Sequence, residues 1–279
     1  MIKIGFIDYY LDNWHADNYP SFFRENSNGE CIVAWAYGQI DNPNGISNEE
    51  WSGKHNIPLC KTFDELIEKS DCIAVLSPDD LQMHVALSDK ALKSGKRVYI
   101  DKILAAEKSD ARQMLDTADL YGGLCWSSSA LGFAAELREI DRESTDVFYI
   151  EGPESFEVGA VHLIEQAVML ADANPVRVMA TGGEKHPSFV VEFDNGKAAH
   201  LIHRNDDLYT YAVTPVDKNN NCVRRVIESQ FFAEFIKAVI SFFKTGEIPV
   251  SRERIMRTVS VMQSAEVSLE KPFEWVNID

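Results

Sequence analysis

The sequence predicts an α/β protein with an N-terminal Rossmann-like parallel sheet and a C-terminal α+β domain whose open sheet is mainly antiparallel. Two observations carry this prediction. In the first half, short apolar runs alternate with helical patterns, as in a parallel sheet with crossover helices, and residues 71–104 are the clearest case. In the second half, strand patterns follow one another across turn signals such as the Asp-Asn-Gly of residues 194–196. We therefore expect two domains, 1–125 and 126–279.

The stretch 71–104 has the pattern of a strand, a loop, a helix and a second strand. Cys72–Leu76 is a continuous apolar run, which suits a strand buried on both faces, and Arg97–Ile100 is a second such run. His84–Leu92 has helical spacing, and a Lys-Ser-Gly-Lys segment ends it. Two strands joined through a helix are parallel, and ligands bind at the carboxyl ends of such strands. The residues at those ends are Ser77, Pro78, Asp101 and Lys102.

The composition argues against two classes of partner. Of the 279 residues, 45% are hydrophobic and 25% are charged, as in ordinary globular proteins. The formal net charge of −17 argues against nucleic acid and against an anionic membrane surface, because both attract a basic face. No apolar run has transmembrane length. We therefore expect no nucleic-acid or membrane partner.

The expected compartment is the cytoplasm. Residues 1–5 enter a strand pattern directly, without the features of a signal peptide. The five cysteines are scattered and without zinc-like spacing, so we expect free thiols in a reducing environment and no metal site. His200 and His203 lie three apart in a predicted strand, hence on opposite faces, and make a poor metal pair.

The first predicted strand, Ile2–Ile7, should lead into a phosphate-binding turn if the domain binds a dinucleotide. Of the Gly-x-Gly-x-x-Gly fingerprint of such turns only Gly5 is present, because Ile7 and Tyr10 occupy the other glycine positions. The loop must therefore follow another path. His15 beyond it can reach a phosphate or a substrate, or it can cap and pack on the first helix, and the sequence leaves both alternatives open.

The remaining elements of the first domain follow in order. Glu30–Tyr37 is the second strand, and Asp41 after it either meets a ribose or belongs to a surface loop. Thr62 caps a helix, Ser109–Tyr121 forms another, and Leu124–Ser129 is the last strand. The hydroxyl groups at the end of this strand either bind amide or sugar groups or cap the next helix. They belong to Ser127, Ser128 and Ser129.

The second domain begins with a strand over Asp146–Glu151 and an apolar helix that carries His162. An antiparallel sheet follows, and the aromatic stripe of the next helix is expected to be core. The expected strands are Val176–Thr181, Ser188–Phe193, Lys197–His203, Leu208–Val216 and Cys222–Val226, and the closing helices are Glu228–Lys244 and Arg252–Leu269.

Several of these motifs resemble the Gfo/Idh/MocA family, whose members are NAD(P)-dependent oxidoreductases acting mostly on sugars, polyols and their derivatives. The segments that carry the resemblance are SPDDLQMH, ALKSGKRVYI, DKIL, HLIE and TGEIPVS. The chain departs from the family pattern at Asp101, where the family has Glu, at Ile103, where it has Pro, and at Val158, where it has Asp. The missing glycines of the first turn are a further departure.

The resemblance implies roles for particular residues. Lys102 would lie at the substrate hydroxyl with Asp101 orienting it, and His162 would assist the proton transfer. The cofactor contacts implied are Gly5, Ile7, Asp8, Ser77, Pro78, His84 and Asp101. The substrate contacts implied are His15, Lys102, Ser127, Ser128 and His162. Members of the family often form homo-oligomers through the C-terminal sheet, and we expect the same here.

The resulting hypothesis is an NAD(P)-dependent dehydrogenase acting on a sugar, a polyol or a related small hydroxy compound. Residues 1–125 would bind the cofactor, and residues 126–279 would bind substrate and form the oligomer. NAD is favoured over NADP, because no arginine follows the second strand to meet a 2′-phosphate. The alternative is a non-catalytic relative with a degenerate cofactor loop, which binds a small molecule or a protein partner.

Overall fold

The computed structural model describes residues 1–78, 80–183, 186–204, 206 and 208–279. The chain forms two compact units, the first made of Met1–Ser128 and Ala233–Arg252, the second of Ser129–Phe232 and Glu253–Asp279. The sequence placed residues 233–252 in the second domain, whereas the structure places them in the first unit. The physical reason is aromatic packing, described below.

The first unit contains a five-stranded parallel sheet with the strand order β2-β1-β3-β4-β5. All four residues of β3 are buried, as the continuous apolar run indicated. The predicted Rossmann-like parallel sheet is therefore confirmed. The strands are β1 Ile2–Asp8, β2 Cys31–Gly38, β3 Cys72–Val75, β4 Arg97–Ile100 and β5 Leu124–Trp126.

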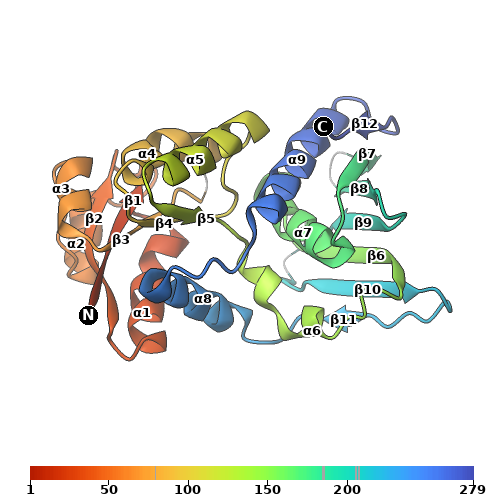
Figure 1. The fold of residues 1–279 in the computed structure, drawn as a ribbon, viewed down its shortest axis with the longest axis horizontal. Coiled ribbons are helices and arrows are strands. Elements are labelled where there is room, and N and C mark those ends of the chain that lie inside the picture. Colours follow the sequence, from red (N-terminus) through yellow and green to blue (C-terminus); the bar gives the residue numbers. More distant parts are fainter. Residues whose placement is uncertain (79, 184–185, 205, 207) are drawn as a thin grey trace. The chain divides into compact units, whose positions relative to one another are not determined.

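Helices cover both faces of this sheet, and Figure 1 shows α4 and α5 on one face and α1 and α8 on the other. The ring of Phe235 in α8 lies 5.6 Å from that of Tyr99 in β4 and 6.3 Å from that of Tyr19 in α1. These contacts explain why α8 joins the first unit, and they confirm its aromatic stripe as core. The helices are α1 Trp14–Asn26, α2 Asn48–His55, α3 Phe63–Lys69, the 3₁₀ turn η1 Leu81–Met83, α4 His84–Leu92, α5 Lys108–Leu120 and α8 Phe231–Thr245.

The second unit contains a seven-stranded sheet with the strand order β11-β10-β6-β9-β8-β7-β12. Only the β6–β9 pair is parallel among these neighbours, so the mainly antiparallel sheet is confirmed. The hairpin predicted from residues 208–216 and 222–226 is shorter than expected, because its ladder joins only Ala212–Val213 to Arg225–Val226, with one further bridge between Val216 and Cys222. The strands are β6 Thr145–Gly152, β7 Pro175–Gly183, β8 His186–Phe193, β9 Ala198–His203, β10 Ala212–Asp217, β11 Arg225–Val226 and β12 Val276–Asn277.

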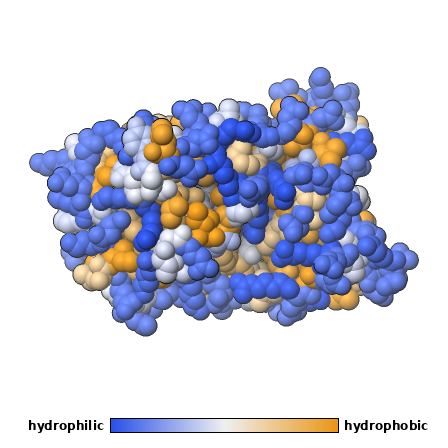
Figure 2. Space-filling model, viewed as in Figure 1, coloured by the Kyte–Doolittle hydropathy of each residue, from blue (hydrophilic) through white to orange (hydrophobic). Residues whose placement is uncertain are grey.

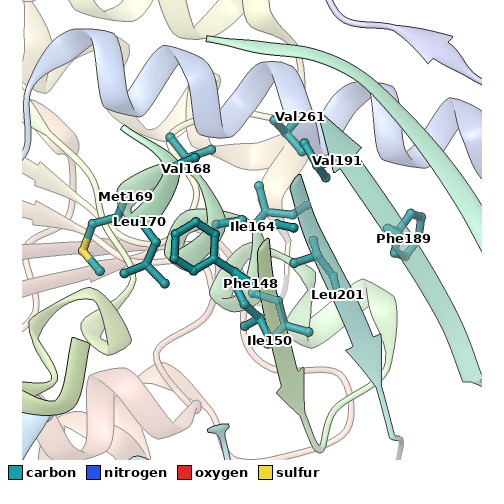
Figure 3. Packing of buried hydrophobic residues seen from close by; sticks show 14 of the residues in the cluster. Phe148, Ile150, Ile164, Val168, Met169, Leu170, Phe189, Val191, Leu201 and Val261 are labelled. Atoms are coloured by element: carbon teal, nitrogen blue, oxygen red, sulfur yellow. The ribbon is translucent and has the colours of Figure 1, made fainter. Parts of the chain in front are cut away.

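The core of the second unit lies between one face of this sheet and two helices, α7 (Phe156–Ala171) and α9 (Arg252–Leu269). Figure 3 shows Phe148, Val191 and Leu201 of the sheet directed towards Ile164 of α7 and Val261 of α9. The helix α7 is buried over most of its length, which holds His162 on a fixed backbone. Two short helices, η2 (Ala130–Phe133) and α6 (Ala135–Arg138), precede β6.

The surface fits the acidic, polar composition. Hydrophilic residues cover most of the face drawn in Figure 2, and hydrophobic side chains are exposed there in small groups. None of the helices in the described residues has the length and apolarity of a membrane span. The five cysteines are free thiols, as predicted, and only Cys222 is exposed.

Candidate active site

The turn after β1 lies three residues later than the sequence indicated. Strand β1 continues to Asp8, so Gly5 and Ile7 are inside the strand, and the assignment of Gly5 to the turn is wrong. A Cβ atom at Gly5 would lie 2.4 Å from Ser70 Oγ, so this glycine serves the packing of α3 on the sheet. The glycine spacing, counted from the strand end, falls on Asp8, Tyr10 and Asn13.

Asp8 is a buried carboxyl group at this strand end, with 1% of its surface exposed. Its Oδ1 accepts a hydrogen bond from the backbone N–H of Ser77 at 3.0 Å, and its Oδ2 accepts one from Asn13 Nδ2 at 2.9 Å. Burial raises the pKa of Asp8 to about 8, against the lowering effect of these hydrogen bonds, and the nearby Asp101 raises it further. The neutral acid therefore predominates near pH 7.

The backbone of this turn is bonded to the protein itself. The N–H of Leu11 donates to Asn48 Oδ1 at 3.0 Å, and Asn48 Nδ2 donates to the carbonyl of Ile40 at 2.7 Å. Asn13 caps α1, because its Oδ1 accepts the N–H of Ala16 at 3.0 Å. The turn therefore does not fit the backbone cradle by which the glycine fingerprint holds a pyrophosphate.

The loop after β2 shows no sign of a ribose contact. Asp41 accepts a hydrogen bond from the N–H of Asn48 at 2.7 Å, which ties it to the start of α2. Asp12 accepts from Asn42 Nδ2 at 3.1 Å and from the N–H of Ile46 at 2.9 Å. The first two loops at this edge of the sheet are thus linked by hydrogen bonds, and Asp41 is a loop residue.

The end of β3 is held by buried groups. Ser77 has a positive φ of 61°, and its hydroxyl donates to the carbonyl of Asp80 at 3.1 Å. His84 is fully buried, with Nδ1 2.8 Å from the carbonyl of Ile103 and Nε2 3.1 Å from that of Ser77. Burial lowers its pKa, so the ring is neutral and donates to one of the two carbonyls. His84 therefore links the segment after β3 to the segment after β4. The sequence predicted a cofactor contact for this residue.

Asp101, directly after β4, is the centre of a buried polar cluster. The Tyr99 hydroxyl donates to Asp101 Oδ1 at 2.8 Å, and His15 Nδ1 lies 2.5 Å from Oδ2. Burial acts to raise the pKa of Asp101, but the charge and hydrogen bond of His15, with Lys102 and Tyr99, outweigh it and hold the pKa at about 2. A buried carboxylate is therefore ionised at the ligand-binding edge of the sheet.

Lys102 follows Asp101, and its side chain is partly exposed. Within the described ranges, no group forms a hydrogen bond or an ion pair with its ammonium. The peptide that joins Lys102 to Ile103 is cis. The Ser127 hydroxyl donates to the carbonyl of Asp101 at 3.0 Å, and Ser127 and Ser128 are both buried. Asp101, Lys102 and Ser127 are thus brought together, as the parallel strands predicted.

A second polar cluster lies in the second unit around His162. Its Nδ1 is 2.6 Å from Ser129 Oγ, and its Nε2 is 3.9 Å from Glu154 Oε2. The Tyr211 hydroxyl donates to the same Glu154 oxygen at 2.5 Å. Gly159 leaves the room that Glu154 occupies, because a Cβ there would lie 2.8 Å from Glu154 Cβ. Sequence reasoning missed Glu154, which precedes α7 and reaches His162 from outside that helix.

Two further observations complete the second cluster. Ser129 caps η2, since its Oγ accepts the N–H of Leu131 at 3.2 Å, and its own N–H donates to Glu165 Oε2 at 2.6 Å. Val158, which stands where the family has Asp, is about half exposed and supplies no polar group. Glu154 therefore provides the carboxylate next to His162 that the motif lacks.

The two histidines of β9, His200 and His203, face opposite sides of the sheet, as predicted. His203 is buried, and its Nδ1 lies 3.1 Å from the carbonyl of Glu154. The ring of His200 stacks on that of Tyr149 with centroids 4.9 Å apart. Among the described residues, no group of three or more His, Cys, Asp or Glu could hold a metal ion.

The parallel sheet and the polar residues after β4 define a Rossmann-type α/β unit, and a second α/β unit follows it. Residues 39–128 match the GFO_IDH_MocA family model, described as an oxidoreductase family with an NAD-binding Rossmann fold. The resemblance to the Gfo/Idh/MocA oxidoreductases is thus confirmed, and the match covers part of the first unit. No curated protein matches the chain by sequence.

Solved structures share the fold over the whole chain. GenD2 from gentamicin A biosynthesis, in complex with NAD, has a TM-score of 0.82 at 12% identity, covering 100% of this chain and 96% of its own. Myo-inositol 2-dehydrogenase from Lactobacillus plantarum has a TM-score of 0.81 at 12% identity, with 100% and 99% covered. Myo-inositol dehydrogenase from Lactobacillus casei, in complex with NAD(H) and myo-inositol, has a TM-score of 0.80 at 13% identity, with 100% and 97% covered. At these identities the likeness establishes the fold.

Proposed function

We propose that the protein is an NAD(P)-dependent oxidoreductase that acts on a hydroxyl group of a sugar, a polyol or a related small hydroxy compound. The observation that carries the proposal is the pair Asp101–Lys102 at the carboxyl end of β4. There a buried, ionised carboxylate precedes an ammonium that no described residue binds. NAD is favoured over NADP, as in the family description and in the complexes named above.

The chain's own residues supply binding and charge stabilisation. The Lys102 ammonium donates a hydrogen bond to the substrate oxygen and stabilises the negative charge that develops on it. His162, with its Nδ1 at Ser129, assists at the substrate together with Glu154. A nicotinamide cofactor would supply the hydride acceptor, and Ser77, Asp101 and Lys102 are the residues that would meet it at the sheet edge. The turn at Asp8 offers it no fingerprint contacts.

Calorimetric titration of the protein with NADH and with NADPH tests the proposal. We expect NADH to bind with a Kd between about 1 μM and 1 mM, more tightly than NADPH, and turnover with at least one compound in a panel of inositols and sugars. Heat from neither nucleotide, together with no turnover across the panel, would refute the dehydrogenase.

A second candidate is supported by the turn after β1. A non-catalytic relative that binds a small molecule or a protein partner needs no pyrophosphate cradle. Asp8, Tyr10 and Asn13 stand at the glycine positions, and the N–H of Leu11 is already bonded to Asn48. The same titration separates the two candidates, because this one predicts binding of a polyol without binding of either nucleotide.

We further propose a homo-oligomer that forms through the outer face of the seven-stranded sheet, in a cytoplasmic protein with free thiols. On two central strands of this face, Tyr149 and Ile202 are exposed, 43% and 38% respectively, and His200 stacks on Tyr149. An open sheet face that carries such side chains is suited to an interface. Replacing Ile202 by lysine should convert the oligomer to a monomer in light scattering, and an unchanged mass would count against this interface.

A further inference from the structure

We propose that Glu154 makes the second unit selective for a substrate that carries an ammonium group, so that the hydroxy compound is an amino sugar or an amino polyol. The inference rests on the proposed function, because it names the class of substrate that meets His162. All the residues that it uses lie in the second unit, so the binding that it describes needs no nucleotide.

Two glycines make room for Glu154 and for the tyrosine that binds it. A Cβ atom at Gly159 would lie 2.8 Å from Glu154 Cβ. A Cβ atom at Gly152, at the end of β6, would lie 2.9 Å from Tyr211 Cε1. Neither glycine has a positive φ, so the reason for glycine at both positions is the close approach of these two side chains. The backbone therefore holds Glu154 and Tyr211 against each other.

The carboxylate of Glu154 keeps acceptor positions for a ligand. The Tyr211 hydroxyl donates to its Oε2 at 2.5 Å. Burial raises the pKa of Tyr211, and the hydrogen bond to Glu154 and the charge of Glu154 raise it further, so the hydroxyl keeps its proton. Among the residues that the structure describes, no other group donates a hydrogen bond to this carboxylate. Because an ionised carboxylate accepts about four hydrogen bonds, most of its acceptor capacity is left for a ligand.

Glu154 also differs from the carboxylates near it in its charged partners. Glu151 pairs with Arg204 at 3.1 Å. Glu165 pairs with Arg254 at 3.1 Å. In the described part of the chain, no lysine or arginine forms an ion pair with Glu154. Its negative charge is therefore available to a cationic ligand.

His162 faces the same carboxylate without bonding to it. The distance from His162 Nε2 to Glu154 Oε2 is 3.9 Å, which is longer than a hydrogen bond. The side chains of His162 and Glu154 are 14% and 23% exposed, so a small ligand can reach both. A compound with an ammonium group next to a hydroxyl would bind the two residues at once, with the ammonium at Glu154 and the hydroxyl at His162. This is the arrangement of a 2-amino sugar.

An ammonium group fits this site better than the hydroxyl of a neutral sugar does. It carries three N–H donors and no acceptor, which complements a carboxylate that only accepts. Hydrogen bonds between charged partners are about twice as strong as neutral ones. The net charge of −17 also attracts a cation and repels an acidic sugar. We therefore expect the amino compound to bind about tenfold more tightly than its neutral counterpart.

Matched pairs of ligands test the inference by binding alone. Glucosamine and glucose, galactosamine and galactose, and an amino-inositol and myo-inositol are titrated into the full chain without nucleotide, and saturation-transfer NMR measures the Kd of each. We expect the amino member of at least one pair to bind about tenfold more tightly than its neutral partner, and the difference to shrink as the salt concentration rises. N-acetylglucosamine, whose nitrogen carries no charge, should lack this advantage.

Two variants show whether Glu154 is the source of the preference. Glu154→Gln removes the charge and keeps an oxygen for the Tyr211 hydroxyl. In this variant the two members of a pair should bind within about threefold of each other, and the Kd of the neutral member should change little. The matched control is Glu157→Gln, which removes the same charge from an exposed residue in the first turn of α7 and should keep the preference. Thermal unfolding of each variant checks that it is folded.

Three results would overturn the inference. They are equal or weaker binding of the amino member in every pair, a preference that persists in Glu154→Gln, and no binding of any compound in the pairs. None of these results bears on the dehydrogenase, which is judged by nucleotide binding and by turnover across the panel above. A protein that fails those two measurements can still show the preference for the amino compound, so the two failures are distinguishable.

Discussion

Replacing Lys102 by methionine should lower kcat by about 10²- to 10³-fold, the largest effect that we expect from a single charge in this chain. The ammonium binds no other described group, so its loss breaks no internal ion pair, and methionine keeps an unbranched side chain of similar length. What is lost is the donor to the oxygen on which negative charge develops. Steady-state kinetics with the accepted substrate measures the loss of kcat, and the unfolding curve of the variant shows whether its stability is unchanged.

A surface lysine provides the control for this substitution. Lys93 is about half exposed at the end of α4 and pairs with Asp89 at 2.7 Å, a contact that contributes little to stability. Lys93→Met should leave kcat unchanged. If Lys102→Met also retains wild-type kcat, the ammonium is only a solvated residue at a strand end, and the function proposed from Asp101–Lys102 loses its main support.

Asp8 should make the protein less stable as the pH rises, relative to an Asp8→Asn variant. The pKa of Asp8 is about 8 in the folded state against 3.8 for the ordinary group, so the folded state holds a proton that the unfolded chain releases. The contribution of this bound proton to the unfolding free energy is complete below about pH 4 and is lost as the pH rises to about 8. The difference in unfolding free energy should change by about 1.4 kcal/mol per pH unit, on the order of 5 kcal/mol in all.

Urea unfolding of both proteins at pH 5, 6, 7 and 8 measures this difference, because other titrating groups cancel between them. In the Asp8→Asn variant the side-chain oxygen can still accept the N–H of Ser77. The new amide nitrogen, however, lies against Asn13 Nδ2, and two donors cannot bond each other. This lowers the unfolding free energy by about 1 kcal/mol at every pH. Parallel stability curves for the two proteins would show that Asp8 is ionised when folded, and that the turn is better hydrated than its burial indicates.

The sequence was most informative where burial on two faces forces a simple pattern. The run Cys72–Leu76 contains β3, which is observed as Cys72–Val75, and α4 and α9 have the predicted bounds His84–Leu92 and Arg252–Leu269. Parallel strands are covered by helices on both faces, so they appear as continuous apolar runs that turn residues interrupt. The same logic placed Asp101, Lys102 and Ser127 at one edge of the sheet.

The end of the first strand was predicted within one residue, at Ile7 against the observed Asp8. The error lay in the fingerprint, because its first glycine was assigned to Gly5, which lies inside the strand and packs against α3. Glu154 was missed for another reason. It reaches His162 from the segment before α7, and helical spacing cannot indicate a contact made from outside the helix.

The sequence by itself determined the two kinds of sheet, most helices and the residues at the ends of β3 and β4, because hydrophobic periodicity is a local consequence of burial. Only the tertiary structure decided that α8 joins the first unit. It also decided that the Asp8 carboxyl is buried and that His15 is paired with Asp101. These features depend on side chains that are 69 and 86 positions apart, or more than 130 in the case of α8, and only the folded chain brings them within a few ångströms.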